Sequence, residues 1–82
     1  MTEKQKEYIN RNLQAFLHNF GSVRIEKVPY AGFEIYFPAD SSNFMMYCEN
    51  IYTLDGWLYG CVQAAVRKEL KTAFSEMHKN EN

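Results

Sequence analysis

Apolar positions at the start of the chain recur with the period of an α-helix. They are Ile9, Leu13, Phe16, Leu17 and Phe20. Thr2 and Gln5 match a capping box, in which two side chains satisfy backbone amides at a helix start, and Gly21 is a typical C-terminal stop. The pattern predicts a helix over about residues 3–20 with a single apolar stripe.

The next segment changes to a period of two, which is typical of β-strands with one buried face. Alternation runs through SVRIEKV, residues 22–28, and again through GFEIYF, residues 32–37. Pro29 and Gly32 supply turn residues between the two runs. We therefore predict a β-hairpin.

The run FMMYCE, residues 44–49, is compatible with either a strand or the start of a helix. It alternates, and it follows the turn cluster ADSSN, residues 39–43, so a third antiparallel strand is the favoured interpretation. A third strand would also stabilise the hairpin, since isolated hairpins are marginal.

From Asn50 or Thr53 the sequence predicts a helix that continues to about His78, with Asp55 in its first turn. Such a helix would be nearly 40 Å long at about 1.5 Å per residue. A globule of this chain length is only about 30 Å across. We expect the helix end to protrude, fray or meet another chain, and residues 79–82 to form a disordered tail. The fold class is thus one small α+β domain over residues 1–82: an N-terminal helix, a two- or three-stranded antiparallel meander, and a long C-terminal helix packed on the sheet.

The C-terminal helix carries two different faces. Its apolar stripe is Leu58, Val62, Val66, Leu70, Ala73, Phe74 and Met77, with Tyr59 at the edge. On the opposite face Gly56, Gly60 and Ala64 recur every four residues. Helix-interior glycine costs roughly 1 kcal/mol relative to alanine, so a close approach by another element is expected there.

Two interpretations of the glycine face stay open. In one, the first helix or the sheet packs closely on Gly56, Gly60 and Ala64 while Trp57 fills the core. In the other, Trp57, Tyr59, Gly60 and Ala64 form a contact surface for a second subunit or another protein. Exposed Tyr36 and Tyr47 would extend that surface, since tyrosine is favoured in interfaces.

Composition excludes several classes of function. The chain is 46% hydrophobic and 16% aromatic, enough for a folded core, and its net charge of −1 provides no long-range attraction for nucleic acid or anionic membranes. Cys48, Cys61 and His18 have no partners at metal-ligand or catalytic spacing, and no phosphate-binding or nucleophile motif is present. We expect no enzymatic activity, no cofactor, no bound metal and no small-molecule substrate. The opening MTEKQKEYINRN has no apolar signal region, so a reduced, cytoplasmic location is expected.

The segment NIYTLDGWLYGCVQAA, residues 50–65, resembles short uncharacterised proteins of bacterial mobile elements and phages that carry a Leu-Asp/Asn-Gly-Trp-Leu-Tyr-Gly-x-Val-Gln-Ala segment. The matching positions are 54–60 and 62–64. The resemblance implies a bacterial or phage origin and brings no activity, cofactor or site residue with it.

The leading functional prediction is a non-enzymatic protein–protein interaction module, as a homodimer or as a small adaptor or inhibitor. The alternative is a regulator of nucleic-acid machinery. It would act either as an acidic mimic that blocks a nuclease, through Glu34, Asp40, Glu49 and Asp55, or as a weak nucleic-acid binder. The basic residues for direct binding would be Arg67, Lys68, Lys71 and Lys79 of the C-terminal helix.

Overall fold

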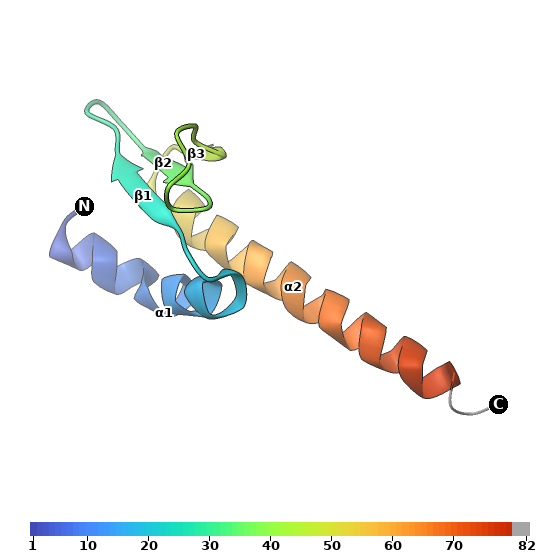
Figure 1. The fold of residues 1–82 in the computed structure, drawn as a ribbon. Helices are drawn as coiled ribbons and strands as arrows, with labels where there is room; N and C mark the ends of the chain where they lie inside the picture. The colour runs from blue at the N-terminus through green and yellow to red at the C-terminus, as the bar shows by residue number, and fades with distance from the viewer. Residues whose placement is uncertain (80–82) are drawn as a thin grey trace.

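The computed structural model describes the backbone of residues 1–79 and the side chains of residues 1–68. Along the chain lie helix α1 (Glu3–Phe20), strands β1 (Arg24–Lys27), β2 (Phe33–Tyr36) and β3 (Met46–Cys48), and helix α2 (Ile51–Lys79). The three strands form one antiparallel sheet in the order β1-β2-β3 (Figure 1). This is the predicted α+β fold with a meander between two helices.

Helix α1 begins and ends where its capping residues lie. The Thr2 hydroxyl accepts a hydrogen bond from the Gln5 backbone amide, and the Gln5 side chain accepts one from the Thr2 amide, so the capping box is complete. At the other end Gly21, with a φ of 92°, donates its amide to the Leu17 carbonyl oxygen at 2.8 Å. Ile9 and Phe16 are the buried members of the apolar stripe.

The sheet buries the face that the alternation predicted. Ile25 pairs with Ile35, and Ile35 pairs in turn with Met46, so these three side chains lie on the same face of the sheet. Phe33, Ile35 and Cys48 are buried. The strand interpretation of residues 44–48 is confirmed, although β3 begins only at Met46 because Phe44 and Met45 still belong to the preceding loop.

Helix α2 begins one residue after Asn50. The Asn50 side-chain oxygen accepts a 2.8 Å hydrogen bond from the Thr53 backbone amide, so Asn50 is the N-cap and Thr53 is not. With this start Asp55 lies beyond the first turn, which holds no acidic residue, and its predicted role at the helix dipole is wrong. Instead the Asp55 carboxylate accepts a 2.9 Å hydrogen bond from the Asn12 side-chain amide of α1.

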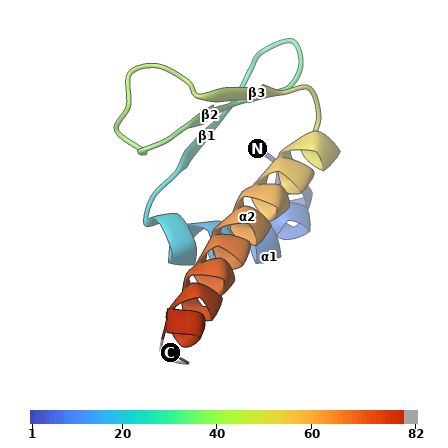
Figure 2. The same ribbon diagram turned by 90° about the vertical axis from the view of Figure 1, so that its right-hand side faces the viewer.

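The two helices lie side by side and run in the same direction (Figures 1 and 2). Contacts advance together along both: Tyr8 meets Tyr52, Asn12 meets Asp55, and Phe16 meets Trp57. Side chains from α1, β2, β3 and α2 share one core. Its buried members are Ile9, Phe16, Phe33, Ile35, Cys48, Leu54, Leu58 and Val62.

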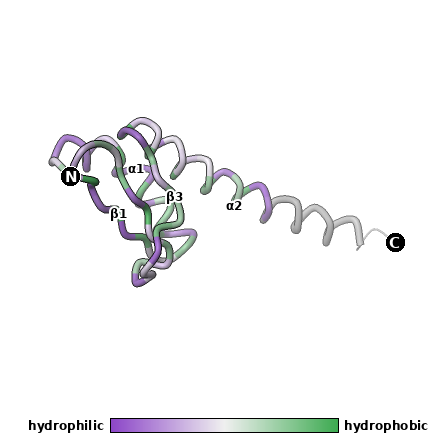
Figure 3. Tube along the Cα trace, turned by 90° about the horizontal axis from the view of Figure 1, so that it is seen from above, coloured by the Kyte–Doolittle hydropathy of each residue, from purple (hydrophilic) through white to green (hydrophobic). Residues whose placement is uncertain are grey.

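Helix α2 extends well beyond this core. The molecule measures 58 × 26 × 18 Å, and Figure 3, seen from above, shows α1 and the strands gathered at one end with α2 leading away from them. Leu58 and Val62 of the predicted stripe are buried, whereas Val66 is already 36% exposed. The remaining predicted members, Leu70, Ala73, Phe74 and Met77, lie outside the residues whose side chains are described. Of the predicted tail, Lys79 is the last residue of α2, and residues 80–82 lie outside the described part of the chain.

Candidate functional site

Helix α2 carries a row of exposed residues that begins beside α1 and continues over the side that α1 and the sheet leave uncovered. We call it the outer face of α2 and define it as Tyr52, Gly56, Tyr59, Gly60 and Ala64, all of which are exposed. Tyr52 is 67% exposed and Tyr59 is 54% exposed. The face thus combines two large aromatic side chains with three small residues.

The predicted internal close packing at the glycines is wrong. A Cβ built on Gly56 or on Gly60 would meet nothing within 4 Å in the part of the chain that the structure describes. Neither α1 nor the sheet approaches these positions, because both pack on the opposite side of α2, where Leu54 and Leu58 are buried. The contact-surface interpretation of Gly60 and Ala64 stays a prediction.

Trp57 does not share the environment of Gly60. Its side chain is half-buried and packs at the edge of the core. The Trp57 ring lies 5.6 Å from the Phe16 ring, centroid to centroid, with an angle of 32° between the planes. Trp57 therefore ties α2 to α1, and only its exposed part is available to a partner.

An aromatic pair that the sequence did not predict extends the outer face of α2 onto α1. The rings of Tyr8 and Tyr52 meet edge to face, with centroids 5.4 Å apart and an angle of 88°. Tyr8 is 52% exposed. No sequence spacing links the two residues, so only the packing of the helices shows that they meet.

Tyr36 and Tyr47 lie elsewhere, on the side of the sheet that points away from the helices. The Arg24 guanidinium lies 4.1 Å from the centre of the Tyr36 ring, and the Phe44 ring lies edge to face with it at 6.4 Å. Partial desolvation, followed by the charges of Glu34 and Glu26, raises the pKa of Tyr36, while Arg24 opposes the shift. The Tyr47 hydroxyl donates a 2.8 Å hydrogen bond to the Ala31 carbonyl oxygen. The structure therefore does not bring these two tyrosines together with Gly60.

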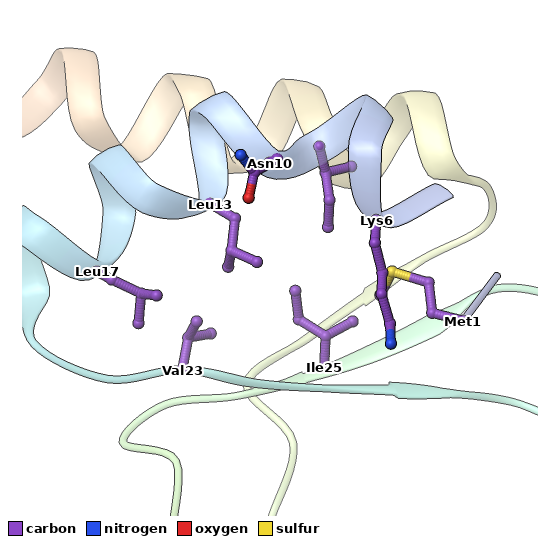
Figure 4. A pocket seen from close by; sticks show the side chains of 8 residues that line it. Met1, Lys6, Asn10, Leu13, Leu17, Val23 and Ile25 are labelled. Atoms are coloured by element: carbon purple, nitrogen blue, oxygen red, sulfur yellow. The ribbon is translucent and has the colours of Figure 1, made fainter. Parts of the chain in front are cut away.

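A groove runs between α1 and β1, with a volume of about 440 Å³. Figure 4 shows Leu13 and Leu17 pointing from α1 toward Val23 and Ile25 of the opposite segment. The other residues that line it are Met1, Lys6, Ile9 and Asn10. The sequence predicted each apolar stripe but not the space left between them.

Among the described residues, the candidates for metal binding and for thiol chemistry are the His, Cys, Asp and Glu side chains. No group of three or more His, Cys, Asp and Glu side chains there could hold a metal ion. Cys48 and Cys61 are free thiols, and burial raises the pKa of each, which keeps them protonated at neutral pH. The described part of the chain also contains no helix with the length and apolar character needed to cross a membrane.

The charged surfaces considered in the alternative function are dispersed. Asp55 faces α1 and is bonded to Asn12, whereas Glu34 lies on β2 opposite Glu26 and Tyr47. Arg67 and Lys68 are exposed on α2, but Lys71 and Lys79 lie outside the residues whose side chains are described. Glu34 and Asp55 therefore do not belong to one continuous acidic patch.

Comparison with known proteins found no match to any protein-family model, to any curated protein or to any solved structure. The resemblance of residues 50–65 to proteins of mobile elements stays a prediction.

Proposed function

We propose that this protein is a non-enzymatic interaction module that associates with a second copy of itself through the outer face of α2. One observation carries the proposal. Two glycines stand in the interior of an exposed helix, flanked by exposed tyrosines, and nothing within the described chain lies against them.

Exposed glycine is costly in a helix unless the missing side chain serves a contact. Each helix-interior glycine destabilises by roughly 0.5–1 kcal/mol relative to alanine. Because Gly56 and Gly60 lie one turn apart, they form a shallow strip along which a second helix can approach closely. In a twofold dimer the same strip on each copy would meet the other, as the self-complementary geometry of such interfaces requires.

The aromatic residues beside this strip suit a protein contact. Tyr8, Tyr52 and Tyr59 each expose about half or more of their surface. Tyrosine contributes large contact area with few rotatable bonds and a hydroxyl that can stay hydrated at the rim. Large exposed apolar surface on a small domain commonly marks an interaction site.

The length of α2 adds a second argument. The helix has 29 residues, and among those whose side chains are described, up to Lys68, Val62 is the last that it contributes to the buried core. A helix that extends past its supporting core gains little from packing within its own chain, and isolated helical segments are marginal in water. Association with a second copy would support the extended part.

The proposal is tested by introducing bulk at the strip. Gly60→Leu should convert the dimer to a monomer, because a leucine side chain holds the two backbones apart, and it should leave the fold intact because no described residue lies within 4 Å. The matched control is Gln14→Leu, which places the same side chain on an exposed position of α1. Sedimentation velocity gives the mass and circular dichroism reports the fold.

The outcomes separate the alternatives. A dimer for wild type and Gln14→Leu with a monomer for Gly60→Leu supports the outer face of α2 as the interface. A dimer that survives Gly60→Leu would place the interface elsewhere, and a wild-type monomer at every concentration would overturn self-association.

A further inference from the structure

The groove between α1 and β1 is a second feature with unused binding capacity, and it is independent of the outer face of α2. Its walls are the side chains of Leu13 and Leu17 on α1 and of Val23 and Ile25 on the opposite segment (Figure 4). All four are only half-buried, although the neighbouring Ile9 is fully buried. The apolar surfaces of the helix and the strand are therefore directed at each other without filling the space between them.

The size of the groove suits a small molecule rather than a single water. Its volume of about 440 Å³ lies within the range of roughly 300–1,000 Å³ that is typical of ligand pockets. Burial of a flexible apolar chain there would remove the facing leucine, valine and isoleucine surfaces from water, which is favourable at about 25 cal/mol per Å². The walls provide few polar groups, so the ligand body must itself be apolar.

A positive charge at one end of the groove favours a ligand with an anionic group at that end. The Lys6 side chain extends from α1 toward the β1 side, at the Met1 end of the groove (Figure 4). Among the described residues that line the groove there is no Asp or Glu. Lys6 does face Glu3, but their contact of 3.7 Å is long and both side chains are largely exposed, so an incoming anion can compete with it. Asn10 provides a further polar group at the edge.

We propose that this groove binds a free, straight-chain carboxylic acid of medium length. The alkyl chain would lie between Leu13, Leu17, Val23 and Ile25, and the carboxylate would pair with the Lys6 ammonium. The combination of an apolar groove with positive charge at its end is complementary to a monoanionic amphiphile, and it disfavours a cationic amphiphile.

Titration followed by two-dimensional amide NMR tests the proposal on the intact chain. Hexanoate, octanoate and decanoate, each below its micelle concentration, should produce saturable shifts at residues 9–17 and 23–25. Affinity should rise about 4-fold per methylene, which corresponds to roughly 0.8 kcal/mol for each buried CH₂. Octanoate should bind more tightly than 1-octanol.

Two lysine variants identify the head-group contact. Lys6→Met should bring the affinity for octanoate down to that for 1-octanol, whereas Lys4→Met, an exposed lysine on α1 that does not line the groove, should keep the preference. Both positions are exposed, so unchanged amide spectra outside the site confirm the fold.

Three results would overturn the proposal. The first is the absence of saturable shifts with decanoate. The second is shifts confined to the outer face of α2, and the third is an equal loss of preference in Lys4→Met and Lys6→Met. Binding to phosphatidylglycerol vesicles without binding to free decanoate would likewise contradict it, because the proposed ligand is the free acid.

Discussion

The Tyr47 hydroxyl lies 2.5 Å from the point that a Cβ on Gly32 would occupy, while it donates its hydrogen bond to the neighbouring Ala31 carbonyl oxygen. The Cys48 carbonyl oxygen lies almost as close, at 2.6 Å from the same point. Gly32 also has a φ of 87°, a conformation that residues with a side chain rarely adopt. The tip of the β1–β2 hairpin can thus pack against β3 because Gly32 has no side chain.

Gly32→Ala should therefore destabilise the fold by about 1–3 kcal/mol, from backbone strain together with displacement of Tyr47. The measurement is urea unfolding followed by circular dichroism. Gly21→Ala is the matched control, since Gly21 has a φ of 92° but an open surrounding, and it should cost less. Equal losses at the two glycines would show that the close contact with Tyr47 contributes nothing.

Loss of the hydrogen bond between Asn12 and Asp55 should weaken the α1–α2 interface. The bond joins side chains 43 positions apart in sequence at 2.9 Å, and it is partly buried. Asn12→Ala and Asp55→Ala should each reduce the unfolding free energy by about 1.5–3 kcal/mol, which is typical of a hydrogen bond to a charged group. A double-mutant cycle gives the coupling energy, and strictly additive effects would exclude a direct interaction.

Much of this fold was predictable because its signals are local. The capping box at Thr2 and Gln5, the glycine at 21 and the alternation around Ile35 each act within a few residues, so the sequence pattern is sufficient. The assignment of Asp55 to a helix start failed because Asn50, not Thr53, takes the capping role. Asparagine and threonine are both suitable N-cap residues, so the sequence does not decide between Asn50 and Thr53. The choice depends on which side chain reaches a free backbone amide of the first turn.

The candidate surfaces were less predictable because they depend on how the elements pack. The glycine spacing of α2 predicted a close approach by another element, but periodicity alone could not show that α1 and the sheet lie on the opposite side. The Tyr8–Tyr52 pair depends on how α1 packs on α2, and the groove beside Leu13 depends on the angle between α1 and the strand that follows it. Local patterns do not encode that angle.

Alanine at the exposed glycines should stabilise the isolated chain. Because no described residue lies within 4 Å of a built Cβ, Gly56→Ala and Gly60→Ala should each raise the unfolding free energy by about 0.5–1 kcal/mol. Unfolding is measured at protein concentrations low enough to keep the chain monomeric. A loss of stability at either position would reveal an internal contact on that side of α2.

The two thiols should react slowly and in a defined order. Burial raises the pKa of both Cys48 and Cys61 above the ordinary value of 9.0, so the reactive thiolate is scarce at neutral pH. Cys48 is fully buried and Cys61 is half-buried. Alkylation followed by mass spectrometry should show Cys61 reacting first, at a rate that rises about tenfold per pH unit from pH 7 to beyond about pH 9, because the thiolate is the reactive form. Rapid modification of Cys48 at pH 7 would contradict the packing described for β3.

Self-association through the outer face of α2 is the central claim, and solution mass tests it most directly. Light scattering over a concentration series, at low and at high salt, should show a dimer that persists in salt, since the proposed contact is apolar and is screened little by ions. A mass that stays monomeric throughout the series, or a dimer that dissociates on addition of salt, would contradict it.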